Sequence, residues 1–166
     1  MAKLFVSYSR RDSRTVDSLV TRLSEDGHTA WIDREGIDGG AQWRATIVKA
    51  INAADVVLLV LTAESAASDN VRRELDIAQD APARLVPIQF GAVTVPEAMA
   101  YQLAGVQIID MTQDREAGYQ RLLAVLGTGE ARTPARAARP TGSTVEAADL
   151  SSLGGGGFFS RLFGKK

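Results

Sequence analysis

A run of six aliphatic residues, Val56–Leu61 (VVLLVL), constrains the fold of this 166-residue chain more than any other stretch. No polar residue alternates with them, so as a strand the run must be covered on both faces, as in the centre of a parallel sheet. A short polar connection follows, and then a helix-like segment that carries Glu74. Because open α/β folds bind ligands at the carboxyl edge of such a sheet, Glu74 is the first candidate functional residue.

Residues 1–127 alternate short apolar runs with amphipathic segments. Besides the central run, strands are predicted at residues 3–7, 29–33, 84–90 and 106–110. Helices are predicted from Asp12 or Ser13 to Gly27, around residues 43–51, from the end of the central loop to Gln79, and over residues 114–126. This alternation is typical of βαβ units in one parallel sheet. The predicted fold class is α/β: a flavodoxin-like three-layer sandwich with five parallel strands in the order 2-1-3-4-5 and helices on both faces.

Three local features refine this prediction. Pro87 has no N–H for a ladder, which indicates a bulge or a strand near the sheet edge. Apolar residues at helical spacing predict one buried helix face, made by Trp43, Ile47, Val48 and Ile51. Residues 91–105 show no clear periodicity, so no element is predicted there.

Charge and composition exclude several function classes. Residues 1–127 hold 13 Lys and Arg against 17 Asp and Glu, so they offer no basic field for nucleic acid. The chain has no cysteine, and His28 is its only histidine, which excludes thiolate zinc sites and multi-histidine metal sites. No membrane-span-length run and no signal-peptide pattern occurs, so a cytoplasmic protein is expected.

The composition changes at residue 128. Residues 128–157 are rich in Ala, Arg, Gly, Ser, Thr and Pro, which is a linker composition. Residues 158–166 (FFSRLFGKK) form a short cationic-aromatic segment. This segment is either an amphipathic element that contacts a membrane surface or a partner, or a frayed terminus. The predicted organisation is thus a domain at 1–127, a flexible linker at 128–157 and this C-terminal segment.

Four stretches of the chain carry motifs that are informative together. They are FVSYSRRD at residues 5–12, WIDREGIDGGAQWRATIVKAI at residues 31–51, the helix pattern Ser-x-x-Val-x-x-Glu-Leu at Ser68, Val71, Glu74 and Leu75, and RLVPIQF at residues 84–90. In this order they resemble the Toll/interleukin-1 receptor (TIR) domain family, bacterial type: its first box, its second strand with the so-called BB loop and the next helix, its glutamate-bearing helix, and its fourth strand with a proline. The resemblance covers about residues 3–127.

The resemblance implies an enzymatic role for Glu74. Many TIR domains cleave the nicotinamide-ribose bond of NAD+, and in those members the helix glutamate is catalytic. The chemistry suits one carboxylate, because nicotinamide departs as a neutral molecule and the transition state is oxocarbenium-like. NAD+ would be the substrate, with no cofactor and no metal. The alternative for Glu74 is a solvated helix glutamate beside Arg72 and Arg73.

By the same resemblance, Ser9, Arg10 and Asp38 are predicted to face the nucleotide, with Arg10 able to hold phosphate through two parallel hydrogen bonds. The alternative for each is a solvated loop position. The BB-loop residues Ile37, Gly39, Gly40 and Trp43 are predicted to pack against another TIR domain. A homo-oligomer or filament would therefore complete the active site, in bacterial defence against phage or in signalling.

One departure from the family pattern favours a different class of function. Enzymatic members often carry Trp four residues before the glutamate, where this chain has Asn70. The alternative is a non-enzymatic scaffold that acts through TIR–TIR contacts, including interference with host TIR signalling. A phosphorylation receiver is excluded, because Ser7-Tyr8 and Thr62 stand where it needs an acidic pair and a phosphoacceptor Asp.

Overall fold

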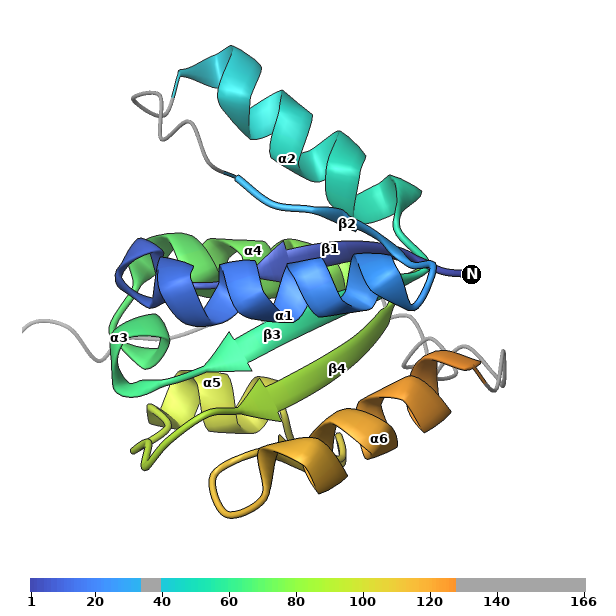
Figure 1. Cartoon of the computed structure of the whole chain (residues 1–166). Coiled ribbons are helices and arrows are strands. Elements are labelled where there is room, and N and C mark those ends of the chain that lie inside the picture. The colour runs from blue at the N-terminus through green and yellow to red at the C-terminus, as the bar shows by residue number, and fades with distance from the viewer. Residues whose placement is uncertain (34–39, 128–166) are drawn as a thin grey trace, which may run out of the picture. The chain divides into compact units, whose positions relative to one another are not determined.

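A computed structural model of the chain describes residues 1–33 and 40–127. Its centre is one parallel sheet with the strand order β2-β1-β3-β4-β5, which confirms the predicted order (Figure 1). The strands are β1 (Lys3–Ser7), β2 (Thr29–Trp31), β3 (Val56–Leu61), β4 (Arg84–Gln89) and β5 (Ile109–Asp110).

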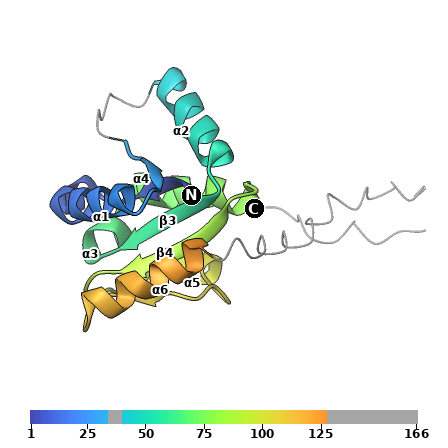
Figure 2. The same ribbon diagram turned by 45° about the vertical axis from the view of Figure 1, so that its right-hand side comes forward.

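Helices cover both faces of this sheet. They are η1 (Arg10–Asp12), α1 (Ser13–Glu25), α2 (Ala41–Ala53), α3 (Ala63–Ala66), α4 (Asp69–Asp80), α5 (Glu97–Gln102) and α6 (Arg115–Gly127). The helices α1 and α6 pack on one face, whereas α2, α4 and α5 pack on the other (Figures 1 and 2). The predicted three-layer arrangement is therefore confirmed.

The central strand is buried along its whole length, as its aliphatic run predicts. Its alternate residues enter different cores. Leu58 and Val60 pack with α1 and α6, while Leu59 and Leu61 pack with α4 and α5. This strand pairs with β1 on one side and β4 on the other, so both its edges are satisfied as well.

The same alternation in β1 decides where its last residue points. Leu4 and Val6 belong to the α1–α6 core, while Phe5 belongs to the α2–α4 core. Because side chains alternate between the faces of a strand, Ser7 lies on the face of Phe5. That face is covered by α4, and this places Ser7 beneath the helix that carries Glu74.

The end of α1 follows the predicted chemistry, whereas Asp12 at its start makes no side-chain capping hydrogen bond. The turn after α1 places Gly27 at a φ of 84°, a conformation that glycine adopts without a Cβ clash. At the start of α4, the Ser68 side chain accepts a hydrogen bond from the N–H of Val71 at 3.4 Å. These caps fix where the two helices meet the sheet edges.

Two predicted strands are too long by two or more residues, and a third, β4, ends one residue earlier than predicted, at Gln89. The strand β2 ends at Trp31 instead of residue 33, because the Asp33 carbonyl accepts a hydrogen bond from the Tyr8 hydroxyl instead of joining the ladder. The strand β5 begins at Ile109 instead of residue 106, since the Val106 N–H donates to Leu103 in the turn that follows α5.

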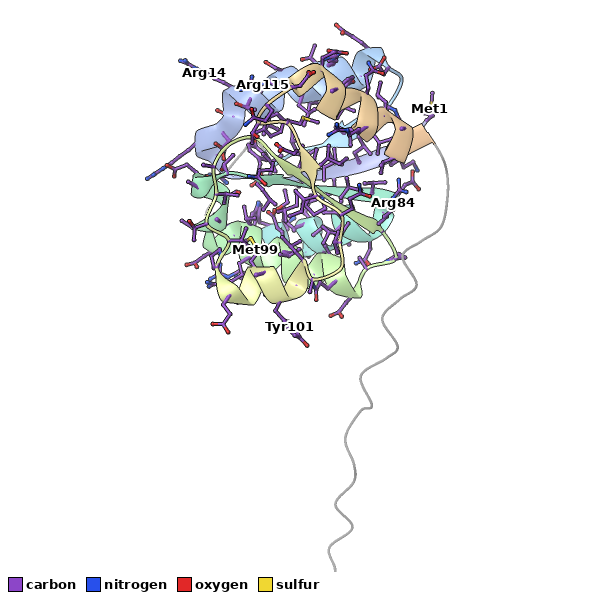
Figure 3. The ribbon with its side chains drawn as sticks, turned by 90° about the horizontal axis from the view of Figure 1, so that it is seen from below. Met1, Arg14, Arg84, Met99, Tyr101 and Arg115 are labelled. Carbon is purple, nitrogen blue, oxygen red and sulfur yellow. The ribbon has the colours of Figure 1, made fainter. Side chains whose placement is uncertain are left out.

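The segment without clear periodicity contains the short helix α5. Its buried face is narrow: Met99 is 2% exposed, whereas Tyr101 is 64% exposed, and Figure 3 shows them pointing inward and outward. A six-residue helix with so few core contacts leaves little periodic signal in the sequence.

Two local predictions are settled in part. Pro87 sits opposite Leu59 in an unbroken register, so it makes no bulge, although β4 is indeed next to the edge strand. On α2, Ile47 and Ile51 are buried as predicted, but Val48 is 38% exposed, so it does not belong to the buried face of the helix.

No helix within the described ranges is long and apolar enough to cross a bilayer. The predicted linker at 128–157 and the cationic-aromatic segment at 158–166 lie outside the described residues. Those two boundaries remain predictions.

Candidate functional site

The carboxyl end of β1 and the first turns of α4 form a small polar site. The Ser7 hydroxyl donates a 2.7 Å hydrogen bond to Oε2 of Glu74. Both side chains are buried, with exposed fractions of 1% for Ser7 and 8% for Glu74. The contact joins residues 67 positions apart, and it exists because α4 covers the sheet face on which Ser7 lies.

Glu74 is buried because it shares the core-facing side of α4 with apolar residues. Val71 precedes it by three positions and Ala78 follows it by four, and both are buried. The neighbours Arg72 and Arg73 are exposed. The solvated-glutamate alternative is therefore wrong for this position.

Burial changes the protonation of Glu74. Desolvation raises its pKa from 4.5 to about 7, opposed by the hydrogen bond from Ser7. The nearby Asp33 carboxylate raises this pKa further, and the Arg10 guanidinium lowers it. Glu74 is thus close to half ionised at neutral pH, which is typical of carboxylates at functional sites.

Glu74 opens into a pocket of about 250 Å³. Its lining comes from the end of β1 and η1, the end of β2 and the start of α4: Val6, Tyr8, Ser9, Arg10, Arg11, Asp33, Ser68, Asn70 and Glu74. Oε1 of Glu74 makes no hydrogen bond to any residue in the described ranges, and the small exposed surface of this residue faces the pocket. Oε2 is held by Ser7, so Oε1 is the oxygen that a ligand would meet.

Charged groups form one wall of the pocket. The Arg10 guanidinium lies 3.0 Å from the Asp33 carboxylate, and the side chains are 53% and 17% exposed. The Tyr8 hydroxyl donates to the Asp33 carbonyl at 3.1 Å, which fixes the backbone there. An anionic ligand would therefore compete with Asp33 for Arg10.

A second contact fixes the opposite side of the site. Thr62, which follows β3, donates its hydroxyl proton to Asp12 of η1 at 2.7 Å. The same threonine caps α3 through the Ser65 N–H at 3.0 Å. The loops after β1 and β3 are thereby tied together at the carboxyl edge of the sheet, where these neighbouring strands end.

The predicted site residues divide into three groups. Glu74, Ser9 and Arg10 line one pocket, while their predicted roles in catalysis and nucleotide binding stay predictions. Ile37, Asp38 and Gly39 lie outside the described residues, so their predicted roles stay predictions.

Gly40 and Trp43 are the two predicted self-association residues that the structure describes. Gly40 is the N-cap of α2, with an extended backbone. Trp43 packs against the α2–α4 core, away from the Glu74 pocket. Its indole N–H is buried without a hydrogen-bond partner in the described part of the chain.

Sequence reasoning did not assign individual roles to Ser7, Tyr8, Asp33 or Ser68. For Ser7, the available signal was its position two residues after Phe5 at the end of a strand, which places both side chains on one face of the sheet. Tyr8 and Asp33 carried only the signal of polar residues after two neighbouring strands. Among the described residues, no group of three or more His, Asp or Glu side chains could hold a metal ion.

Comparison with known proteins places the chain in a family. The profile of the TIR domain family matches residues 4–123. No curated protein matches the chain. Among solved structures, the TIR domain of the Toll-related receptor TRR-2 from Hydra magnipapillata is similar, with 18% identity and a TM-score of 0.63. The match covers 75% of this chain and 97% of that one.

Two further structures share the fold. The TIR domains of the activated Roq1 resistosome that recognises the pathogen effector XopQ have a TM-score of 0.58 at 16% identity, over 76% of this chain and 99% of theirs. The CMP N-glycosidase BcmB of Clostridium botulinum has a TM-score of 0.53 at 13% identity, and the match covers 74% of this chain and 98% of that one. Since the family profile covers most of the chain, the protein belongs to the TIR domain family.

Proposed function

We propose that this TIR domain cleaves the nicotinamide-ribose bond of NAD+, with Glu74 as the catalytic residue. The observation that carries the proposal is the buried Glu74 carboxylate, held through one oxygen by Ser7 and open to the pocket at the other. A desolvated carboxylate that opens into a pocket suits a reaction that develops positive charge.

The reaction needs little from the protein beyond electrostatics. The bond between ribose C1′ and the pyridinium nitrogen breaks, and its electron pair goes to the nitrogen, so that nicotinamide leaves neutral. The ionised form of Glu74 stabilises the oxocarbenium-like ribose in that transition state. Water then adds at C1′ and releases a proton, giving ADP-ribose; attack by an adenine nitrogen of the same molecule instead gives a cyclic isomer.

Two guanidinium groups at the pocket mouth support a pyrophosphate-containing substrate, although Asp33 holds that of Arg10 and Glu64 holds that of Arg11 at 2.8 Å. Arg10 and Arg11 both line the pocket, and Arg10 offers a planar guanidinium that matches phosphate oxygens. Asp33 holds Arg10 in the structure, so a bound pyrophosphate would replace one anion by another.

Self-association is the second part of the proposal. The pocket of about 250 Å³ lies below the usual range of roughly 300–1,000 Å³ for small-ligand sites, and NAD+ is a dinucleotide. The remaining contacts would come from outside this pocket, and packing of a second copy through Gly40 and Trp43 would supply them. In Roq1, TIR domains are part of an assembled resistosome, and BcmB is an N-glycosidase on the same fold.

The decisive experiment follows nicotinamide release from NAD+ over a wide range of protein concentrations. We expect turnover that rises faster than protein concentration, and loss of at least 100-fold in Glu74→Gln, which keeps the shape and removes the charge. The matched control is Glu25→Gln, an exposed glutamate near the end of α1. Chromatography of the product separates ADP-ribose from a cyclic isomer. Equal turnover in Glu74→Gln and wild type would contradict the catalytic assignment.

The alternative is a non-enzymatic scaffold that acts through TIR–TIR contacts. Asn70 favours it, because a polar side chain lines the pocket where enzymatic relatives often have tryptophan. A protein that assembles, measured by light scattering, and releases no nicotinamide at any concentration would support the scaffold. In either case we propose a cytoplasmic role in bacterial defence or signalling.

A further inference from the structure

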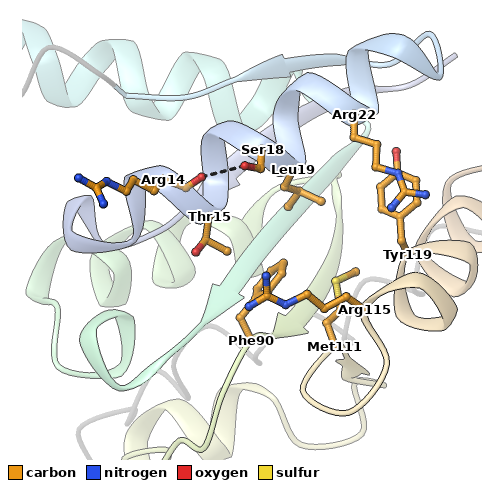
Figure 4. Close-up of a pocket in the computed structure, with 9 residues that line it drawn as sticks. All are labelled: Arg14, Thr15, Ser18, Leu19, Arg22, Phe90, Met111, Arg115 and Tyr119. Atoms are coloured by element: carbon orange, nitrogen blue, oxygen red, sulfur yellow. Dashed lines mark hydrogen bonds between the residues drawn. The ribbon is translucent and has the colours of Figure 1, made fainter.

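A second pocket, of about 270 Å³, lies between α1 and α6 (Figure 4). It shares no residue with the Glu74 pocket. Its lining is Arg14, Thr15, Ser18, Leu19, Arg22, Phe90, Met111, Arg115 and Tyr119. The proposed NAD+ chemistry makes no use of this pocket.

Helical periodicity produces one wall of the pocket. Arg14, Ser18 and Arg22 follow one another at four-residue spacing, so they lie along one side of α1. The floor is apolar: Leu19 and Met111 are 6% and 2% exposed, and Phe90, which follows β4, is half-buried. The pocket therefore combines a charged rim with an apolar base.

The inner wall is held in place by contacts between α1 and α6. Arg22 lies 2.7 Å from the Glu116 carboxylate, and its guanidinium lies 3.8 Å from the centre of the Tyr119 ring. The Tyr119 hydroxyl donates to Asp26 at 2.6 Å, and burial together with this contact raises the Tyr119 pKa. These links keep the two helices together, so the pocket exists without a ligand.

The rim of the pocket carries positive charge, and no acidic residue of the lining neutralises it. Three arginines line the pocket and no acid does. Arg22 is paired with Glu116, but Arg14 and Arg115 form no ion pair with any acid in the described ranges. Figure 3 places both on the same side of the molecule, and Figure 4 shows Arg115 extending across the pocket toward Phe90.

Nearby acids are turned to other partners. Asp110 accepts the N–H of Thr112 at 2.7 Å, and Asp114 accepts that of Ala117 at 2.9 Å. These bonds hold the two carboxylates at the turn before α6 and at the start of that helix. The guanidinium of Arg115 thus remains available above an apolar floor.

We propose that this pocket binds a small organic anion with an aromatic body, no larger than a mononucleotide. The ring would lie against Leu19, Phe90 and Met111, and its phosphate or carboxylate would bind Arg115, with Arg14 at the outer rim. A guanidinium is weakly hydrated and presents parallel N–H donors, so it binds such groups well beside apolar surface. At about 270 Å³ the pocket lies just below the roughly 300–1,000 Å³ of ordinary small-ligand sites, so its occupant is limited to one ring with its charged substituent.

Amide NMR of the full chain tests this with four probes: phenyl phosphate, benzoate, inorganic phosphate and phenol. We expect the first two to shift the amides near Phe90, Met111 and Arg115 in a saturable way, and the last two to bind at least tenfold more weakly. Comparison of phenyl phosphate with benzoate distinguishes phosphate from carboxylate recognition. Equal binding of inorganic phosphate would show an adventitious ion only and would overturn the proposal, as would equal binding of phenol or the absence of any saturable shift.

Two substitutions on one helix complete the test. Arg115→Gln removes the available guanidinium, and we expect phenyl phosphate to bind about tenfold more weakly, as loss of one charge-assisted contact implies. Arg121→Gln is the matched control, because Arg121 is exposed on α6 and does not line the pocket. Equal affinity in Arg115→Gln and wild type, or equal loss in both variants, would overturn the assignment of Arg115.

Discussion

Ser7 and Glu74 are joined by a 2.7 Å hydrogen bond between the last residue of β1 and the second turn of α4. Ser7 anchors one carboxylate oxygen, and the other is left for the pocket. The pair thus links the geometry of the sheet edge to the protonation of the candidate catalytic group.

Substitution Ser7→Ala removes a hydrogen bond that favours the ionised form of Glu74. The pKa of Glu74 should then rise further above 7, so nicotinamide release at pH 7 should fall several-fold and recover partly at pH 9. A pH–rate profile measures this, and 13C NMR of the Glu74 carboxyl gives the same pKa without depending on activity. Ser18→Ala, which removes an exposed hydroxyl on α1, is the control. An unchanged pKa in Ser7→Ala would contradict the proposed role of the bond.

Protein stability should depend on pH through Glu74. Its pKa is about 7 in the folded protein and near 4.5 when unfolded, so the folded state binds the proton more tightly. The contribution of Glu74 is therefore most favourable below pH 4.5, and it is lost as pH rises through 7. The shift corresponds to on the order of 3 kcal/mol.

The variant Glu74→Gln lacks this titration. Its free energy of unfolding, measured by denaturant titration, should differ from that of wild type by some fixed amount at pH 4.5. Between pH 4.5 and pH 8 the variant should become more stable relative to wild type by about 2–3 kcal/mol. A difference between the two proteins that stays constant from pH 4.5 to 8 would show that Glu74 titrates normally.

Substitution Arg10→Gln removes the guanidinium at the pocket mouth and leaves Asp33 without its ion pair. If Arg10 holds the pyrophosphate, KM for NAD+ should rise about tenfold. Because Arg10 lowers the pKa of Glu74, its loss should raise that pKa. The pH profile of the rate at saturating NAD+ should therefore move toward higher pH. Steady-state kinetics at pH 7 and 9 measure both effects, with the exposed Arg73→Gln as control. A KM equal to that of wild type would remove Arg10 from substrate binding.

Asn70 lines the same pocket one helical turn before Glu74 and has an exposed side chain. Asn70→Trp would add an aromatic surface on which the nicotinamide ring can stack, so KM should fall several-fold, by the equivalent of about 1 kcal/mol. Nicotinamide release at low NAD+ measures this gain. A raised KM would show that Asn70 itself contacts the substrate.

Gly118 on α6 tests the packing of α6 against the segment after β5. A Cβ at this position would lie 2.7 Å from Met111 Cγ and 2.8 Å from the Asp110 carbonyl oxygen. Because backbone cannot move aside as a side chain can, Gly118→Ala should destabilise the fold by about 1–3 kcal/mol. Gly127→Ala on the same helix meets open space and should be nearly neutral. Equal thermal stability of both variants would contradict the close contact at Gly118.

The architecture could be predicted from the sequence alone. Continuous burial of Val56–Leu61 requires a central parallel strand, and the alternation of strands and helices leaves few topologies, so the predicted strand order was confirmed. Ser9 and Arg10 follow the first strand and Glu74 lies on the helix after the central strand, and the three residues line one pocket. Each of these results depends on local pattern, which a linear chain carries in full.

The environment of the site, in contrast, depends on how the helices pack on the sheet. The spacing of Glu74 fits both a solvated glutamate and a buried one, and the packing of α4 over β1 resolves the choice. The same packing pairs Ser7 with Glu74, and the early end of β2 brings Asp33 to Arg10. Burial, charge and pKa at this site arise from residues that are tens of positions apart in the chain, so they become defined only when the sheet and its helices pack together.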